Sequence, residues 1–255
     1  MILFEDNDSK YELYRQCILE NCRGRKPARW NQIRYDIEAR HYTYPLIDRL
    51  INFANLNSPE AQPGQTALDV GCGHGTLSLL LAKRGFKTTT LDRTEINIPK
   101  EIFAQYNIQF VLQDICQNFN MPSNSFNLVI FAEVLEHLPS YHPKILRNVR
   151  NCMKPDGLLF ISKPDREGDW PQGKLQTAYG IEHFYQMKEV SDFVGDTHYY
   201  VYNLTEFHQL CEFSGFKIIS LDSVLTASGR KHIYAVLSPE EFVADLNEDP
   251  TALNL

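Results

Sequence analysis

Apolar residues recur every three or four positions in two segments near the N-terminus. The segments are "YELYRQCILENC" (11–22) and "YPLIDRLINFAN" (44–55), and the polar stretch "RGRKP" (23–27) separates them. Such spacing puts the apolar side chains on one face of a helix. The pattern therefore predicts two N-terminal helices, which with the following linker form a helical cap over residues 1–62.

The pattern changes at Thr66, where short apolar runs begin to alternate with helix-length segments. The runs are "TALDV", "KTTTLD", "IQFVLQD", "NLVIFA" and "GLLFISK", followed after a long gap by "KIISLDSV" and "HIYAVLS". Runs of this length, each ending in a polar or glycine signal, are typical of strands. Their alternation with helical segments predicts an α/β fold, in which a parallel sheet carries helices on both faces.

Composition limits the size and class of the protein. The chain has 255 residues, of which 43% are hydrophobic, enough for one sizeable core with an appendage. Its six cysteines form no CxxC pair, which favours reduced thiols over a disulfide framework or a structural metal site. The first residues turn acidic after "MILF", unlike a signal peptide, and no long apolar run suggests a membrane span. We therefore expect a cytoplasmic protein.

Charge weighs against a general nucleic-acid binder. The formal net charge is −7, which disfavours electrostatic attraction to a polyanion. One stretch departs from this balance, because "RGRKPARWNQIR" (23–34) contains five basic residues and no acid. It is either a solvated loop or a contact for an anionic substrate or partner.

A glycine-rich turn follows the first predicted strand. In "LDVGCGHGT" the glycines stand at positions 71, 73 and 75. Missing Cβ atoms let a ligand lie against the backbone, where N–H groups point at its negative end. The spacing is GxGxG, and it differs from the GxGxxG of nicotinamide-binding folds because position 76 is threonine.

Three acids stand at the ends of three successive predicted strands. Asp69 precedes the glycine turn, Asp92 ends "KTTTLD", and Asp114 ends "IQFVLQD". Asp92 is placed to accept both hydroxyls of a ribose, and Asp114 to accept from an exocyclic amino group. Each acid alone could instead cap a helix.

These motifs together resemble the class I S-adenosylmethionine-dependent methyltransferases over roughly residues 63–240. The resemblance rests on "LDVGCGHG", "LD" (91–92), "QD" (113–114), "FNLVIFAEVLEHL" (126–138) and "MKPDGLLFISKP" (153–164). It implies a doubly wound Rossmann-like seven-stranded sheet whose last strand is antiparallel. It also implies S-adenosylmethionine as cofactor, bound by Asp69, Gly71, Cys72, Gly73, Asp92, Asp114, Ile115, Phe131, Ala132 and Glu133. His74, a bulky residue between two glycines, departs from the family pattern.

Acceptor chemistry is expected at "AEVLEHL" (132–138), which we predict to begin a helix. Glu133, Glu136 and His137 are then spaced i, i+3 and i+4, on one helix face. The motif resembles the metal-binding ExxEH of ubiquinone-pathway O-methyltransferases and of small-RNA 3′-end methyltransferases, although relatives without metal share it. His183 or His198 would complete a metal site or supply a base. We favour a metal-free base, because the short motif fixes no fourth ligand.

An aromatic segment lies between the fifth strand and the next helix, at about 164–203, and we interpret it as an inserted lid over the site. Its side chains either form a substrate wall or pack in a small core beneath the loop. They are Trp170, Tyr179, His183, Tyr185, His198, Tyr199 and Tyr200. The last residues, 241–255, form an acidic tail.

The sequence thus predicts methyl transfer from S-adenosylmethionine to a small molecule, at a hydroxyl oxygen. The candidate catalytic residues are His137, Glu133, His183 and His198. The alternatives are an RNA 2′-O-methyltransferase, which would need a wider basic track, and a non-catalytic module that binds the cofactor. The identity of the acceptor and the oligomeric state stay open.

Overall fold

The computed structural model describes residues 9–22, 43–57, 64–139, 142–168, 198–226 and 229–240. Several of the sequence predictions fall outside these ranges. They concern the basic stretch 23–34, most of the proposed lid with His183, and the acidic tail. Among the described helices, none has the length and hydropathy needed to cross a membrane.

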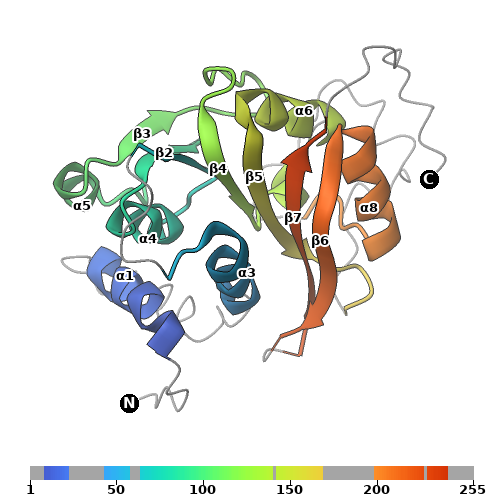
Figure 1. Ribbon diagram of the computed structural model, residues 1–255, viewed down its shortest axis with the longest axis horizontal. Helices are drawn as coiled ribbons and strands as arrows, with labels where there is room; N and C mark the ends of the chain where they lie inside the picture. Colours follow the sequence, from blue (N-terminus) through green and yellow to red (C-terminus); the bar gives the residue numbers. More distant parts are fainter. Residues whose placement is uncertain are drawn as a thin grey trace.

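Seven strands form one mixed sheet in the order β3-β2-β1-β4-β5-β7-β6 (Figure 1). The strands are β1 (Thr66–Val70), β2 (Lys87–Asp92), β3 (Gln109–Leu112), β4 (Phe126–Ala132), β5 (Met153–Pro164), β6 (Phe216–Leu225) and β7 (Lys231–Pro239). The first five pair in parallel, whereas β7 is antiparallel to both β5 and β6. The predicted doubly wound sheet with an antiparallel last strand is confirmed.

Helices cover both faces of the sheet (Figure 1). One face carries η1 (Ser9–Tyr11), α1 (Glu12–Cys22), α3 (Tyr44–Ala54), α4 (Thr76–Lys83) and α5 (Lys100–Gln105), and the other carries α6 (His142–Cys152) and α8 (Leu204–Phe213). Both predicted N-terminal helices are present. The start of α8 is fixed by a capping box, in which Asn203 and Glu206 each accept a hydrogen bond from the other's backbone N–H.

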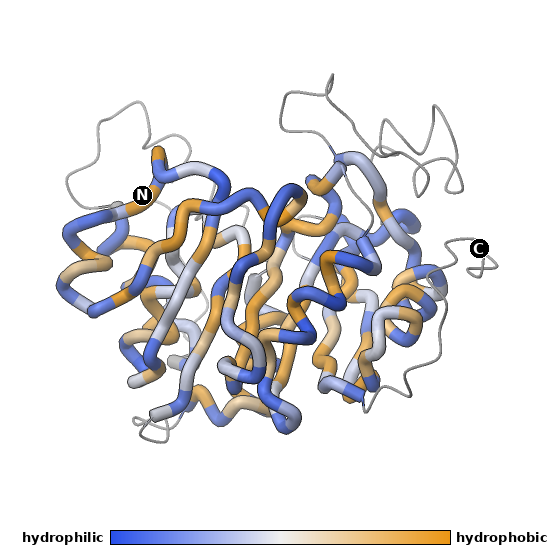
Figure 2. The backbone as a smooth tube through the Cα atoms, turned by 90° about the horizontal axis from the view of Figure 1, so that it is seen from above, coloured by the Kyte–Doolittle hydropathy of each residue, from blue (hydrophilic) through white to orange (hydrophobic). Residues whose placement is uncertain are grey.

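The core has two layers because side chains alternate along each strand. In β4, Leu128 and Ile130 pack toward α1, α3 and α4, whereas Val129 and Phe131 pack toward α6 and α8. All four side chains are buried, as expected for a parallel strand covered on both faces. Figure 2 shows the hydrophobic stretches following the inner strands, whereas hydrophilic residues lie in the loops and alternate with hydrophobic ones along the helices.

The strand order reverses between β1 and β4, and this reversal positions the site. The chain runs outward from β1 through β2 to β3, and then returns to place β4 on the other side of β1. Open α/β sheets bind ligands in the crevice beside the carboxyl ends of such strands. The glycine turn after β1 and the motif after β4 therefore meet at one edge.

The tyrosines at the end of the predicted lid belong to the core. Tyr199, Tyr200 and Tyr202 are at most 4% exposed and pack against the layer under α6 and α8. Their segment is held by His142, whose Nδ1 lies 2.7 Å from the Tyr202 hydroxyl and whose Nε2 lies 3.0 Å from the Leu138 carbonyl oxygen. For Tyr199 and Tyr200 the structure thus selects core packing over the substrate wall.

Acid is expected to weaken the fold through His142. Burial lowers its pKa to about 4, below the value of about 6.5 in an unfolded chain. Between these values the unfolded chain binds the extra proton, so this stability is present above pH 6.5 and lost as the pH falls toward 4. A decrease from about pH 6.5 to about pH 5 should cost about 2 kcal/mol.

Urea unfolding at several pH values checks this expectation. His142→Gln removes the titrating group, so the free energy of unfolding should depend less steeply on pH, by up to one proton. A pH dependence identical to that of the wild type would show that His142 does not contribute.

Candidate active site

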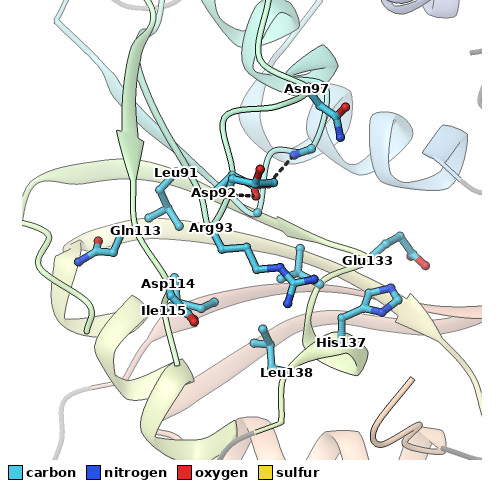
Figure 3. A pocket seen from close by; sticks show the side chains of 14 residues that line it. Leu91, Asp92, Arg93, Asn97, Gln113, Asp114, Ile115, Glu133, His137 and Leu138 are labelled. Carbon is cyan, nitrogen blue, oxygen red and sulfur yellow. Dashed lines mark hydrogen bonds between the residues drawn. The ribbon is translucent and has the colours of Figure 1, made fainter. Parts of the chain in front are cut away.

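A pocket of about 280 Å³ opens at the carboxyl ends of β1, β2, β3 and β4 (Figure 3). It is lined by Gly71, Gly73, Leu91, Asp92, Arg93, Thr94, Asn97, Gln113, Asp114, Ile115, Glu133, Val134, His137 and Leu138. Six predicted cofactor residues and the predicted base His137 are among them. The structure therefore brings together the glycine turn, two strand-end acids and the ExxEH motif.

The glycines of the turn serve different purposes. All three have positive φ, between 54° and 71°, which L side chains rarely adopt. A Cβ on Gly71 would lie 2.5 Å from the Val134 side chain, and one on Gly75 would lie 2.4 Å from the ring of Phe103. A Cβ on Gly73 would meet nothing within 4 Å. Gly71 and Gly75 therefore permit close packing, while the bare Gly73 leaves open space beside the pocket.

The N-terminal cap contacts the same turn. Asn21 of α1 is 3% exposed, and its Nδ2 donates to the carbonyl oxygen of His74 at 3.1 Å. This hydrogen bond links the first helix of the cap directly to the residue that departs from the family's glycine pattern. The cap thus stabilises the conformation of the turn.

Asp92 organises the edge of the pocket at the end of β2. Its Oδ2 accepts from the backbone N–H of Gly73 at 3.0 Å, and its Oδ1 accepts from that of Thr94 at 3.1 Å (Figure 3). A carboxylate offers about four acceptor positions, so Asp92 can hold the glycine turn and still accept from a ligand. Asp114 accepts from the Cys116 N–H at 2.9 Å through Oδ1.

Four predicted cofactor residues do not line the pocket. Asp69 is 3% exposed, and its Oδ2 accepts from the Ser78 hydroxyl at 2.5 Å, which joins β1 to α4. Phe131 is fully buried, and Ala132 and Cys72 pack against the layer under α4. Burial raises the pKa of the Cys72 thiol far above its usual range.

The prediction that a helix begins directly after β4 is wrong. Only a single 3₁₀ turn, η3 (Leu135–His137), forms there, and α6 begins later. The reason lies at Glu133, whose left-handed φ of 55° interrupts any helix starting at the strand end. Glu133 donates its N–H to the Ser162 carbonyl oxygen at 2.8 Å, which fixes this strained residue against β5.

Glu133 is paired with a histidine from the far end of the chain. Nδ1 of His232 in β7, whose side chain is 2% exposed, lies 3.2 Å from Glu133 Oε2 and 3.3 Å from Oε1. Burial alone would raise the pKa of Glu133, but the hydrogen bond and charge of His232 outweigh it and hold the pKa below the usual range. Glu133 is therefore a carboxylate at the rim of the pocket.

Glu136, His137 and His198 converge beside the pocket. Their ligand atoms lie within 4.8 Å of one another, an arrangement that could hold a metal ion. The rings of His137 and His198 meet edge to face, with centroids 4.9 Å apart. Burial, followed by the neighbouring His137, lowers the pKa of His198 to about 4. Burial and then Glu133 raise the pKa of Glu136 well above its usual range.

Several site residues were missed by sequence reasoning. They are Lys163, which is buried at the end of β5, His232 in β7, which pairs with Glu133, and Arg93, which lines the pocket next to Asp92. Lys163 and His232 are fully buried polar residues within apolar strand runs. The sequence features that could have indicated Lys163 and His232 as site residues were a charged residue in "LLFISKP" and a histidine in "HIYAV", both within apolar strands.

Comparisons with known proteins agree with this geometry. A family model described as "Methyltransferase domain" matches residues 39–221. A ubiquinone biosynthesis O-methyltransferase of Coxiella burnetii (strain Dugway 5J108-111) is 30% identical over 184 residues, covering 69% of this chain and 74% of that protein. The enzyme of that name from the RSA 493 strain is 34% identical over 145 residues, and the match covers 54% of this chain and 60% of the relative.

Solved structures share the fold. The PH0226 protein from Pyrococcus horikoshii OT3 superimposes with a TM-score of 0.54 at 21% identity, covering 80% of this chain and 92% of that one. A Burkholderia thailandensis 1,6-didemethyltoxoflavin-N1-methyltransferase, solved with bound 1,6-didemethyltoxoflavin and S-adenosylhomocysteine, superimposes with a TM-score of 0.55 at 16% identity, covering 84% of this chain and 88% of that one.

The residues present suit S-adenosylmethionine. Gly73 leaves a cradle that a Cβ would enter, Asp92 keeps acceptor positions for hydroxyls, and Ile115 supplies an apolar wall beside Asp114. Because the family model matches most of this chain, the chain belongs to the methyltransferase domain family. It is a class I enzyme with S-adenosylmethionine as its cofactor.

Proposed function

We propose that the protein methylates a hydroxyl oxygen of a small molecule, with His137 accepting the hydroxyl proton. The observation that carries this proposal is that His137 lines the same pocket as the glycine turn and the strand-end acids. Its side chain is 37% exposed, so an acceptor can reach the ring. The names of the ubiquinone biosynthesis O-methyltransferases support oxygen as the target.

Each end of the cofactor has its own residues in this proposal. Asp92 accepts the ribose hydroxyls, and Asp114 accepts from the adenine amino group, with Ile115 against the ring. Gly71 and Gly73 lie along the methionine arm. The cofactor supplies a methyl group already activated by its sulfonium, so the protein mainly has to align the acceptor and exclude water.

His137 is proposed as the base because hydroxyl acceptors gain from losing a proton during transfer. Imidazole is suited to this near neutral pH. The convergence of Glu136, His137 and His198 favours a second way to polarise the hydroxyl, through a divalent cation held by these three. Measuring activity after exhaustive chelation separates the base mechanism from the cation mechanism. Only a cation-dependent reaction should stop on chelation and recover when magnesium, manganese or zinc is added.

The experiment that tests the function follows the label from methyl-labelled S-adenosylmethionine. The purified protein is offered a panel of phenols, catechols and sugar alcohols, the matching amines, and a short RNA. Mass spectrometry of the products should find the label on oxygen of a small hydroxyl compound. Labelled amines alone would overturn oxygen as the target, and labelled RNA alone would favour the 2′-O-methyltransferase.

Alanine at two glycines of the turn should separate cofactor binding from folding. Gly75→Ala adds a Cβ 2.4 Å from the Phe103 ring at a left-handed φ, and should destabilise the fold by about 2–4 kcal/mol. Gly73→Ala meets no protein atom and should cost only about 1–2 kcal/mol. Its new methyl group should instead weaken S-adenosylhomocysteine binding, because it stands in the proposed cradle.

Urea unfolding measures the free energy of unfolding of both variants, and titration calorimetry measures their affinity for S-adenosylhomocysteine. Equal destabilisation by both substitutions would contradict the packing argument. Unchanged ligand affinity in Gly73→Ala would mean that the cofactor lies away from this glycine.

A further inference from the structure

The turn after β1 has little conformational preference of its own. Its glycines alternate at positions 71, 73 and 75, and all three adopt positive φ. Glycine populates positive and negative φ about equally, so the peptide groups between these residues can rotate at low cost. Gly71 and Gly73 line the pocket. The shape of the pocket in the free protein therefore depends on the contacts that other segments make with the turn.

Strand β2 holds the first half of the turn. The backbone N–H groups of Gly71 and Cys72 donate to the Leu91 carbonyl oxygen at 2.8 and 3.1 Å, and the next N–H donates to Asp92 Oδ2 at 3.0 Å. In the second half, the N–H of Gly75 donates to the Cys72 carbonyl oxygen at 2.8 Å, a hydrogen bond within the turn itself. The second half thus gains from a contact with a different segment.

Helix α1 supplies that contact through Asn21. This side chain is 3% exposed, and its Nδ2 lies 3.1 Å from the His74 carbonyl oxygen and 3.5 Å from Thr76 Oγ1. Thr76 is the first residue of α4, so one amide group bridges the end of the turn and the start of the helix. Asn21 thereby fixes the orientation of the peptide group that precedes Gly75.

The docking of α1 has other supports besides Asn21. The helix packs against α4 (Figure 1), with Cys17 and Ile18 buried in the same apolar layer. Glu20 pairs with Lys83 at the end of α4, with 2.5 Å between Oε2 and Nζ. Glu20 and Asn21 are neighbours in the sequence, but Glu20 contacts the far end of α4 whereas Asn21 contacts the turn. The two residues therefore allow docking of the helix to be separated from its effect on the turn.

We propose that Asn21 is a positioning residue for the cofactor, which couples docking of α1 to the affinity of the glycine turn for S-adenosylmethionine. By holding the His74 carbonyl it preorganises the turn, so less conformational freedom is lost when the cofactor binds. Such coupling is reciprocal, because the cofactor must stabilise docked α1 by the factor by which docked α1 raises the affinity. The inference rests on the proposed placement of the methionine arm along Gly71 and Gly73.

Titration calorimetry with S-adenosylhomocysteine tests the proposal, at a temperature where circular dichroism shows each variant to be folded. Asn21→Ala should weaken binding about three- to tenfold, the range expected for loss of one hydrogen bond. Glu20→Gln is the matched control, because it removes a contact between α1 and α4 at the neighbouring residue. Since one surface ion pair contributes little to stability, α1 should stay docked and the affinity should change by less than about twofold.

Either of two results would overturn the proposal. Asn21→Ala would bind S-adenosylhomocysteine as tightly as the wild type if the turn needed no support from α1. Glu20→Gln would lose as much affinity as Asn21→Ala if any loosening of α1 had the same effect, and Asn21 would then have no particular role.

Hydrogen exchange of the wild type tests the reciprocal effect, and it also covers the case in which Asn21→Ala does not fold. S-adenosylhomocysteine should slow amide exchange in α1 by about three- to tenfold, and the effect should level off once the protein is saturated. Unchanged exchange in α1 would overturn the coupling. Slowing that keeps growing with ligand concentration would also overturn it, because α1 would then open only when the whole protein unfolds.

These measurements distinguish a failure of this inference from a failure of the proposed function. If Gly73→Ala weakens S-adenosylhomocysteine binding and Asn21→Ala does not, the methionine arm lies along the turn but Asn21 does not position it. If neither substitution changes the affinity, the proposed placement of the methionine arm is itself wrong. No acceptor is used, so the choice of oxygen as the methylated atom does not affect the result.

Discussion

His137→Ala is expected to lower turnover by about 10²–10⁴-fold, the usual contribution of a general base, while S-adenosylhomocysteine binds as in the wild type. The reason is positional. His137 lines the pocket from the 3₁₀ turn after β4, whereas the proposed ribose and adenine contacts come from the ends of β2 and β3. Steady-state kinetics with the best acceptor and calorimetry with S-adenosylhomocysteine measure the two quantities separately.

His208→Ala is a suitable control for this experiment. His208 lies on α8 with its side chain 47% exposed, and its Nδ1 is 3.2 Å from Glu212, so replacing it should leave turnover unchanged. If His137→Ala keeps more than half of the wild-type turnover, alignment alone carries the reaction or another residue takes the proton. If it also loses affinity for S-adenosylhomocysteine, His137 serves the cofactor instead of the acceptor.

The part of the candidate site that we propose to bind the cofactor could be predicted from the sequence because its determinants are local. A strand, a glycine turn and a strand-end acid follow one another within a few residues, and parallel strands bring their carboxyl ends to one edge of the sheet. Gly71, Gly73, Asp92 and Asp114 consequently lie together as expected. Among the three strand-end acids Asp69 was the exception, since the same strand-end position also allows a buried hydrogen bond to Ser78. Cys72, Phe131 and Ala132 also lie outside the pocket lining.

The part around Glu133 and the ExxEH motif, which we propose to serve the acceptor, could not be predicted in this way, because its residues come from distant segments. Glu133 is paired across 99 residues with His232, and Lys163 reaches the carbonyl of Tyr202 across 39 residues. No periodicity in the sequence encodes such pairs. The predicted helix after β4 failed for a related reason: a left-handed Glu133 is stabilised by tertiary contacts with β5 and β7, and these override local propensity.

Tyr199 and Tyr200 illustrate the limit of reading function from composition. An aromatic cluster beside a predicted pocket suits a substrate wall and a core equally well. In the structure these tyrosines belong to the core. His142 contacts the hydroxyl of Tyr202 and Lys163 donates to its carbonyl oxygen, and these contacts hold the segment against the sheet. In the same segment, the His198 side chain lies beside Glu136 and His137 of the ExxEH motif, and the Tyr199 backbone N–H donates to the Glu136 carbonyl oxygen at 2.6 Å.

Asp92→Ala is expected to weaken S-adenosylhomocysteine binding by about 1.5–3 kcal/mol, roughly 10- to 150-fold, the loss typical of hydrogen bonds to a charged group. Asp92 also holds the N–H groups of Gly73 and Thr94, so loosening of the turn has to be separated from loss of the ribose contact. The 2′-deoxy analogue of S-adenosylhomocysteine makes that separation: the wild type should bind it more weakly than the parent compound, and Asp92→Ala should bind both alike. If Asp92→Ala still prefers the parent compound as strongly as the wild type does, the ribose hydroxyl is held elsewhere and Asp92 serves only the turn.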